Sequence, residues 1–439
     1  MADKVDLFDL YFQYVAGTEP PAVFHRWSLI GCIGAILGHQ CWFPFGSSRI
    51  FPNKYIMFVG DPGTRKSTAI KKAVKLIRMA GFDHFGAQKS SQEKFLMDLE
   101  LDNMENDEII GGVNYNGNAP SKKDSIDILA NLNLRLEGDN DGDIPREMFI
   151  AADEFNNFLG PGNLSFQSLL GELWDWDEPA NHYKQRLKNS KSVRIYQPTI
   201  NILAGNTPSS FADCFPLASI GQGFMSRLIL IHSEPSGIKV TVPAVPDETL
   251  TLRIIKHMQT MRQVCIGPIA IDAEAYSALD LIYKSWPDID DARFRHYSSR
   301  RLTHLIKLLI IVTTARLSTT ISILDIIQAN TVLSYAETTM PKAIGELGKS
   351  KNAEAANKIM QVLYNAREFK TIQELYKVVT NDIGGMIELS GLMMNLEQAD
   401  KVFTGKNATG KMGYLPRQKA LNRQLPFTNF LLLQGKEYK

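Results

Sequence analysis

The sequence predicts an α/β protein built on a parallel β-sheet, with a phosphate-binding loop after its first core strand. Residues 55–59 form an uncharged, strand-favouring run, followed by a turn with glycine and proline and by a helix-compatible segment at 66–79. Further strand-like segments alternate with helical ones. That alternation is typical of parallel α/β sheets, whose ligands bind at the carboxyl ends of the strands.

The turn after the first strand carries the residues of a phosphate-binding loop, so we expect ATP and Mg²⁺ as ligands. Lys66 would reach the β- and γ-phosphates, and the Ser67 hydroxyl would hold Mg²⁺. Arg65 stands where the usual pattern has its second glycine; a helical backbone there would accommodate arginine, whereas a positive φ would disfavour it. The alternative is a chance turn before a basic helix. The expected ATP-binding residues are Gly60, Asp61, Pro62, Gly63, Thr64, Arg65, Lys66, Ser67 and Thr68.

Three later segments place polar or charged residues at the ends of apolar strands. Residues 148–152 are followed by Asp153, expected in the Mg²⁺ shell, and by Glu154, expected to polarise the attacking water. The alternative is a buried strand capped by an ordinary Asp-Glu turn, which the upstream phosphate loop disfavours. A third strand, at 198–206, ends in Asn206, and Arg227 directly precedes a fourth.

Composition limits the class of protein. The 439 residues carry a formal net charge of +1, so a nucleic-acid partner would have to be held by local basic groups. The four cysteines lack metal-ligand or disulfide spacing, which favours a reducing compartment, the cytoplasm. Residues 27–48 are uncharged, but their glycines, proline, histidine and glutamine favour a buried helix and a short strand over a membrane span.

Other segments supply local predictions around this core. Residues 82–85 resemble a second strand, 90–93 a capping box, and 164–174 an amphipathic helix. Residues 100–147 are polar and acidic, which indicates a surface insertion with one helix at 125–136. Basic residues then flank a polar turn, which predicts a β-hairpin with a charged tip that would bind DNA; a solvated surface turn is the alternative. Its basic residues include Lys184, Arg186, Lys188 and Lys191.

The remainder of the chain is expected to be mostly helical. A linker at 235–246 precedes a nearly all-helical region at 248–348. Three helices and a basic β-ribbon then indicate a winged helix, a nucleic-acid-binding shape, with a small interaction module as the alternative. The expected domains are a helical N-terminal segment at 1–50, the ATPase core at 51–235, a helical lid at 236–350 and the winged-helix-like domain at 351–439.

Taken in order, six motifs resemble those of AAA+ ATPases encoded by phages and related mobile elements, usually called replicative helicases or primase-helicases. The resemblance spans roughly residues 20–235 and continues weakly through 320. An arginine before the loop lysine also occurs in that family. No primase-like cluster of acids or zinc ligands is visible, so the resemblance covers the helicase part only. The motifs are residues 24–27, 51–53, 60–67, 152–154, 206–208 and 223–227.

The resemblance implies roles for individual residues. Asn206 would be the sensor-1 residue that helps to orient the water, and Arg227 an arginine finger that completes the neighbouring subunit's site. Lys66, Glu154, Asn206 and Arg227 would thus be the catalytic set. Arg301 and Lys307 are the candidates for a sensor-2 cation. The basic hairpin is similar to that of papillomavirus-type and minichromosome-maintenance helicases, which points into the ring pore.

The leading hypothesis is therefore an ATP-driven DNA translocase, a replicative helicase working as a homo-hexameric ring on single-stranded or forked DNA. A primase or a loader is the expected protein partner, and a bacterial host cell the expected setting. Two alternatives stay open at this point. One is an initiator or loader that binds duplex DNA through the winged helix without unwinding it. The other is a protein remodeller whose hairpin grips polypeptide.

Overall fold

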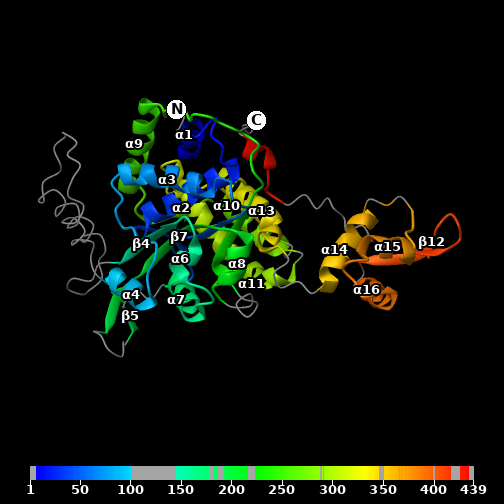
Figure 1. Cartoon of the computed structure of the whole chain (residues 1–439). Coiled ribbons are helices and arrows are strands. Elements are labelled where there is room, and N and C mark those ends of the chain that lie inside the picture. Colours follow the sequence, from blue (N-terminus) through cyan, green and yellow to red (C-terminus); the bar gives the residue numbers. More distant parts are fainter. Residues whose placement is uncertain are drawn as a thin grey trace, which may run out of the picture. The chain divides into compact units, whose positions relative to one another are not determined.

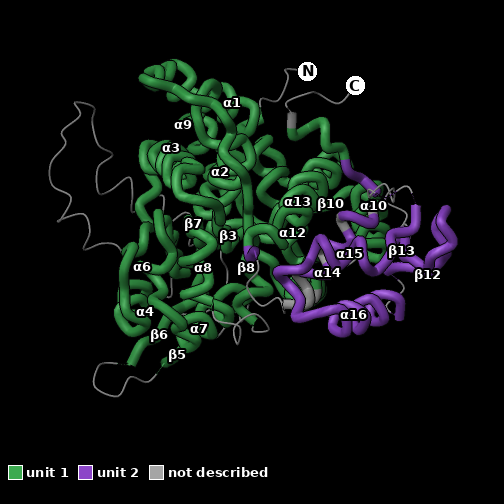
Figure 2. The backbone as a smooth tube through the Cα atoms, turned by 45° about the vertical axis from the view of Figure 1, so that its right-hand side comes forward, with its two compact units in different colours: residues 1–343, 429–439 green, residues 344–428 purple. Residues whose placement is uncertain are grey.

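The chain folds into two compact units, residues 1–343 with 429–439 and residues 344–428 (Figure 2). This is seen in a computed structural model, which describes residues 6–100, 145–176, 182–185, 192–215, 223–286, 289, 291–345, 351–364, 366, 368–398, 401–416 and 426–434. The predicted helix at 125–136 and the tip of the predicted basic hairpin lie outside these residues.

A four-stranded parallel sheet forms the centre of the first unit, which confirms the predicted α/β architecture with a parallel sheet. Its strands are β3 (Tyr55–Val59), β4 (Glu147–Ala152), β7 (Thr199–Asn206) and β8 (Leu228–His232), in the order β4-β7-β3-β8. Every neighbouring pair is parallel. All residues of β3 and β7 are buried, as expected where helices cover both faces of a parallel sheet.

Helices cover the two faces of this sheet (Figure 1). One face carries α2 (Ala22–Leu37) and α3 (Lys66–Met79), and the other carries α6 (Phe155–Leu159) and α7 (Leu164–Trp174). From Trp27 onward the α2 helix belongs to the uncharged stretch of the sequence, and nearly all of its residues are buried. A Cβ on Gly34 would lie 2.9 Å from the Pro52 carbonyl oxygen, so only glycine allows this close packing. Within the described part of the chain, no helix has the length and apolar character needed to cross a membrane.

The remaining elements before the helical region surround the sheet. Two predictions are wrong in detail here. Residues 82–85 form no strand but a single bridge from Phe85 to Phe149 at the β4 edge. The helix after them is capped by Ser91, whose hydroxyl accepts from the Lys94 amide at 3.2 Å, and not by Ser90. These elements are α1 (Leu7–Tyr14), β1 (Cys41–Phe45), β2 (Ser48–Ile50), α4 (Gln92–Glu100), β5 (His182–Gln185), β6 (Val193–Tyr196), α8 (Pro208–Cys214) and the 3-10 helix η3 (Met225–Arg227).

The following region is mainly helical, but short strands interrupt it, which corrects the prediction of a nearly all-helical segment. Its strand β9 pairs with β1 from the N-terminal segment, and β10 pairs with β11. The chain also returns here after the second unit, because the Asn429 amide donates to Thr331 Oγ1 at 2.8 Å. The elements are α9 (Glu248–Val264), β9 (Gly267–Pro268), β10 (Ala270–Ile271), α10 (Ala273–Ser285), η4 (Ala292–Phe294), α11 (Arg295–Ser298), α12 (Arg301–Ala315), β11 (Thr320–Ile321), α13 (Ile323–Ile344) and η5 (Phe430–Gln434).

The second unit has three helices and an antiparallel ribbon. The helices are α14 (Lys351–Tyr364), α15 (Ile372–Val379) and α16 (Met386–Gln398), and the strands β12 (Val402–Lys406) and β13 (Met412–Pro416) pair with each other. The predicted capping box at Thr371 and Glu374 is confirmed, since both of its hydrogen bonds are present. A separate cluster of buried side chains, including Ile359, Leu375 and Met393, forms the core of this unit.

Candidate nucleotide site

The predicted phosphate loop follows the carboxyl end of β3 and leads into α3, as the sequence indicated. Its lysine folds back over the loop: Lys66 Nζ donates to the carbonyl oxygens of Gly60 at 2.6 Å and Asp61 at 3.0 Å, and to Thr64 Oγ1 at 3.2 Å. Burial lowers the pKa of Lys66, while the carboxylates of Asp61 and Glu154 oppose that shift. The ammonium group is therefore held at the loop by weak carbonyl acceptors, which phosphate oxygens would replace.

Arg65, in the place of the second glycine, has a left-handed backbone with φ +64° and ψ +26°. The helical backbone that would accommodate an arginine is not found, and this conformation costs a residue with a side chain about 1–2 kcal/mol. The side chain pairs with a residue from the turn between α1 and α2, with Arg65 Nε 2.5 Å from Glu19 Oε2. Glu19 also accepts from the Val240 amide at 2.9 Å, in the segment between β8 and α9.

The two acidic residues lie beside this loop, directly after β4. A Cβ on Gly205 would lie 2.5 Å from the Asp153 carbonyl oxygen and 3.7 Å from Lys66 Cβ, so the three segments pack closely at the edge of the sheet. The Asp153 carboxylate contacts Lys71 of α3, with Nζ to Oδ2 at 2.5 Å. Glu154 is exposed and directly precedes α6. Both predicted carboxylates are therefore placed at the same edge as Lys66.

Asn206 ends β7, which lies between the strands that lead to the loop and to the acids. It pairs in register with Val59, the last residue of β3. Its side chain is buried: Nδ2 lies 3.4 Å from Asn156 Oδ1, and its Oδ1 accepts from the Thr207 amide at 3.0 Å. The Cys214 thiol also donates to Asn156. The Asn206 amide is thus fixed in one orientation between the loop and Glu154.

The residues expected to hold Mg²⁺ fit a hard cation with oxygen ligands. Ser67 opens the first turn of α3 and is partly exposed, and Asp153 supplies one carboxylate. A phosphate-loop site needs only these two protein ligands, with phosphate and water for the others. In the described residues no group of three or more His, Cys, Asp or Glu forms a metal cage. The Lys71 ammonium group contacts the Asp153 carboxylate, but the Lys71 side chain is 68% exposed. Breaking this ion pair to admit Mg²⁺ therefore costs little free energy.

Arg227 lies at the opposite edge of the sheet. It directly precedes Leu228, which pairs with Tyr55 at the start of β3, whereas the loop follows Val59. The separation along the strands is roughly 16 Å. The guanidinium donates from Nη1 to the Gly223 carbonyl at 2.7 Å, and its Nη2 lies 3.4 Å from Asp175 Oδ2. Within one subunit, Arg227 is therefore not part of the site that contains Lys66.

The two sensor-2 candidates, Arg301 and Lys307, are both buried and bind partners within the chain. Arg301 is 5% exposed, contacts Glu337 at 2.9 Å, donates to Asn330 and stacks on Trp286. Lys307 is buried at the amino end of the sheet, the edge opposite the phosphate loop. Its Nζ donates to Asn53 Oδ1 at 2.5 Å and to the Phe51 carbonyl at 3.0 Å.

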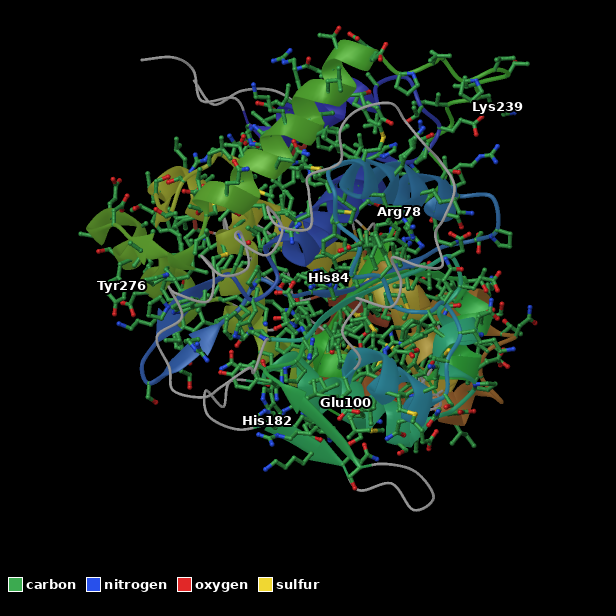
Figure 3. The ribbon with its side chains drawn as sticks, turned by 90° about the vertical axis from the view of Figure 1, so that its left-hand side faces the viewer. Arg78, His84, Glu100, His182, Lys239 and Tyr276 are labelled. Carbon is green, nitrogen blue, oxygen red and sulfur yellow. The ribbon has the colours of Figure 1, made fainter. Side chains whose placement is uncertain are left out.

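The two strands of the predicted basic hairpin are found as β5 and β6, which pair with each other in antiparallel orientation. Lys184 is exposed and lies opposite Arg194. The Arg194 amide donates to the Glu100 carboxylate at 2.8 Å, which joins the hairpin to α4; Figure 3 shows Glu100 near His182 of β5. Arg186, Lys188 and Lys191 lie outside the described residues.

Comparison with known proteins adds no assignment: no protein-family model matches the chain, and no curated protein matches it.

Sequence reasoning missed several residues that complete these sites. Asn156, two positions after Glu154, orients Asn206, and Lys71 neutralises Asp153. Asn156 carries no signal in the sequence, whereas Lys71 follows Lys66 on the same helix and its position could have suggested a neighbour of the loop. Asp175 and Arg300 contact each other near Arg227, although 125 positions separate them in the chain, so only the fold could reveal that arrangement.

Proposed function

We propose that the chain is an AAA+ ATPase that translocates DNA, working in the bacterial cytoplasm as a hexameric replicative helicase of a phage or related mobile element. The observation that supports this most is the meeting of Lys66, Asp153, Glu154 and Asn206 at one edge of the sheet. They come from the ends of three adjacent strands. Phosphoryl transfer needs positioning and charge neutralisation, and these four side chains supply the groups for both.

Each group has a distinct task in ATP hydrolysis. Lys66 exchanges its two carbonyl contacts for oxygens of the β- and γ-phosphates. Ser67 and Asp153 would hold Mg²⁺, which would supply positive charge next to the phosphates. Glu154 polarises the attacking water. Asn206, fixed by Asn156 and by the Thr207 amide, positions that water.

Arg227 takes part in the reaction of a neighbouring subunit. Arg227 precedes the first residue of β8, which lies at the edge of the sheet opposite the phosphate loop of its own chain. A ring brings this edge of one subunit to the phosphate loop of the next. The requirement for such an arginine makes ATP turnover depend on assembly, as expected of an arginine finger supplied in trans.

DNA is held by the hairpin of β5 and β6 with its basic tip. The formal net charge of +1 gives no general attraction for nucleic acid, so local lysines and arginines must make the phosphate contacts. Contacts of this kind follow the backbone and do not read bases, which suits a protein that moves along DNA of any sequence. Each ATP cycle would move the hairpin along the strand.

The hairpin supplies the test of this function. Lys188→Ala with Lys191→Ala should abolish unwinding of forked DNA and stimulation of ATPase activity by DNA, while basal ATPase activity persists. The slope of log K against log salt concentration for binding to single-stranded DNA should become less negative by about 1.4, because two phosphate contacts are lost. The matched control is Lys239→Ala with Lys256→Ala, two exposed lysines outside the hairpin. Normal unwinding by the hairpin variant would reject the translocase.

The second candidate is an initiator or loader that binds duplex DNA, which the three helices and ribbon of residues 344–428 favour. Its test is removal of residues 351–416. Residues 429–439 are kept because they belong to the first unit, where Asn429 contacts Thr331. Loss of all DNA binding in this deletion, together with normal DNA binding by the hairpin variant, would favour the initiator.

A further inference from the structure

Basic side chains gather around Trp174 and Asp175, at the edge of the sheet opposite the phosphate loop. Asp175 Oδ2 accepts from Arg300 Nη1 at 2.6 Å and lies 3.4 Å from Arg227 Nη2. The guanidinium carbon of Arg227 lies 5.9 Å from the centroid of the Trp174 ring, and Lys307 Nζ lies 4.4 Å from it. The Asp175 carboxylate therefore contacts two arginines, and the buried Lys307 lies next to the neighbouring Trp174.

Further basic side chains are buried close to the two arginines. Lys54 and His304 are buried next to Lys307, and Lys54 Nζ donates to the His304 carbonyl at 2.5 Å. Burial and the charge of Lys307 lower the pKa of Lys54 well below its usual range, and burial and the charge of Arg300 lower that of Arg227. Arg227 and Arg300 share the single carboxylate of Asp175, and charges that are partly buried are normally paired, so the two arginines can accept an additional anion.

Of this cluster, Arg227 borders a cavity of about 430 Å³, while Arg300 and Asp175, both partly exposed, lie outside the lining that the described residues form. Arg227 lines it together with Gly223, Phe224, Ser168, Gly171 and Glu172. Arg227 Nε is buried and has no hydrogen-bond partner among the described residues, whereas Nη1 and Nη2 contact Gly223 and Asp175. The cavity is many times the roughly 30 Å³ that one water molecule occupies, which leaves space for a chain of phosphate groups.

We propose that Arg227 and Arg300 form one anion-binding site in which Asp175 is a displaceable counter-ion, and that its ligand is a polyphosphate chain. Asp175 holds the two guanidinium groups close together in the absence of the ligand. Its side chain is 35% exposed, so it can turn toward water when phosphate oxygens take its place. Identifying the polyphosphate as the triphosphate of ATP bound to a neighbouring copy rests on the function proposed above.

Arg300 thereby gains a role that the sequence does not indicate. It lies directly before α12, and α12 is fixed against η3 by His304 Nε2, 3.0 Å from the Ser226 carbonyl oxygen. This contact sets the distance between Arg300 and Arg227. The helical region therefore supplies the second cation of the site, and the segment before β8 supplies the first.

The test uses inorganic tripolyphosphate as the probe and the full chain with Lys66→Ala, so that binding at the phosphate loop is weakened in every sample. Affinity is measured by calorimetry, and thermal melting checks that each variant is folded. Adding Asp175→Asn should tighten binding about three- to tenfold, because the competing carboxylate is gone. Adding Arg300→Ala should weaken it at least about tenfold. Arg295→Ala, an exposed arginine on α11, is the matched control and should have no effect.

Two results would overturn the proposal: weaker or unchanged binding with Asp175→Asn, or an Arg300→Ala variant that binds as well as the Arg295→Ala control. Arg300→Gln serves as a second variant if the alanine protein is unstable. ATPase measurements on mixed variants separate this inference from the proposed function. If the anion site behaves as expected but mixtures of Arg227→Ala and Lys66→Ala proteins stay inactive, the site stands and its assignment to a neighbour's ATP fails.

Discussion

Lys307→Met should remove a large part of the pH dependence of stability in the first unit. Burial, with a smaller contribution from Arg227, lowers the pKa of Lys307 from 10.5 to about 7, although Asp175 opposes that shift. The folded protein therefore binds this proton less tightly than the unfolded chain does. The resulting penalty on folding is complete below pH 7, decreases as the pH rises from 7 to 10.5, and is absent above that range.

The magnitude follows from the two pKa values. Between pH 7 and pH 9, the wild-type protein should gain about 2 kcal/mol of unfolding free energy from Lys307 alone. The methionine variant lacks this gain. It also loses the hydrogen bonds to Asn53 and the Phe51 carbonyl, at about 1–3 kcal/mol for an acceptor left without a partner, but that loss is nearly the same at both pH values.

Urea denaturation at pH 7 and pH 9 measures this difference, with tryptophan fluorescence as the probe because Trp174 contacts Lys307. Lys256→Met, an exposed lysine on α9, controls for the change in total charge. The other buried lysines, Lys54 and Lys66, are present in all three proteins. Because the charge of Lys307 lowers the pKa of Lys54, the difference reports Lys307 together with its effect on Lys54. A stability difference between wild type and Lys307→Met that is equal at the two pH values would refute the reasoning.

The remaining predictions concern turnover. Lys66→Ala should abolish ATP hydrolysis and greatly weaken nucleotide binding, whereas Glu154→Gln should keep nucleotide binding and stop turnover. ATPase assays and nucleotide titration check both variants. Normal turnover in the Glu154→Gln variant would exclude Glu154 as the group that polarises water. Arg227→Ala should keep nucleotide affinity and lose turnover by about a thousandfold or more. Mixing it with Lys66→Ala protein should restore part of the activity, whereas loss of nucleotide binding by Arg227→Ala alone would assign the residue to its own subunit's site.

Much of the core could be predicted from the sequence, because local patterns and packing agree there. The strand at 55–59 and the helix at 66–79 have the bounds that the sequence indicated, since an uncharged run, a turn and an amphipathic helix each mark a clear limit. The capping box at Thr371 was recognisable because both partners lie within one turn of helix. By contrast, Phe82 to Phe85 has the composition of a strand but makes one bridge only, because pairing depends on a distant neighbour.

The site was predictable where it follows strand ends and unpredictable where it depends on contacts between distant segments. Lys66, Asp153 and Asn206 end neighbouring parallel strands or follow them, so topology alone brings them together. The internal partners of Arg301 and Lys307 could not be predicted, because a basic residue on an apolar helix gives no sign of its partners. Glu337 and Asn53, which bind them, are 36 and 254 positions away in the chain.

The return of the chain to the first unit at Asn429 has a mechanical consequence for residues 344–428. Both ends of this unit are covalently joined to the same body, after α13 and before Asn429. A domain with two tethers samples fewer orientations than one with a single linker, because closing a loop at both ends removes conformational freedom. A protease cut within it would leave fragments that the contact of Asn429 with Thr331 still helps to hold together. A force on a ligand bound to residues 344–428 is therefore transmitted to the first unit through both covalent connections.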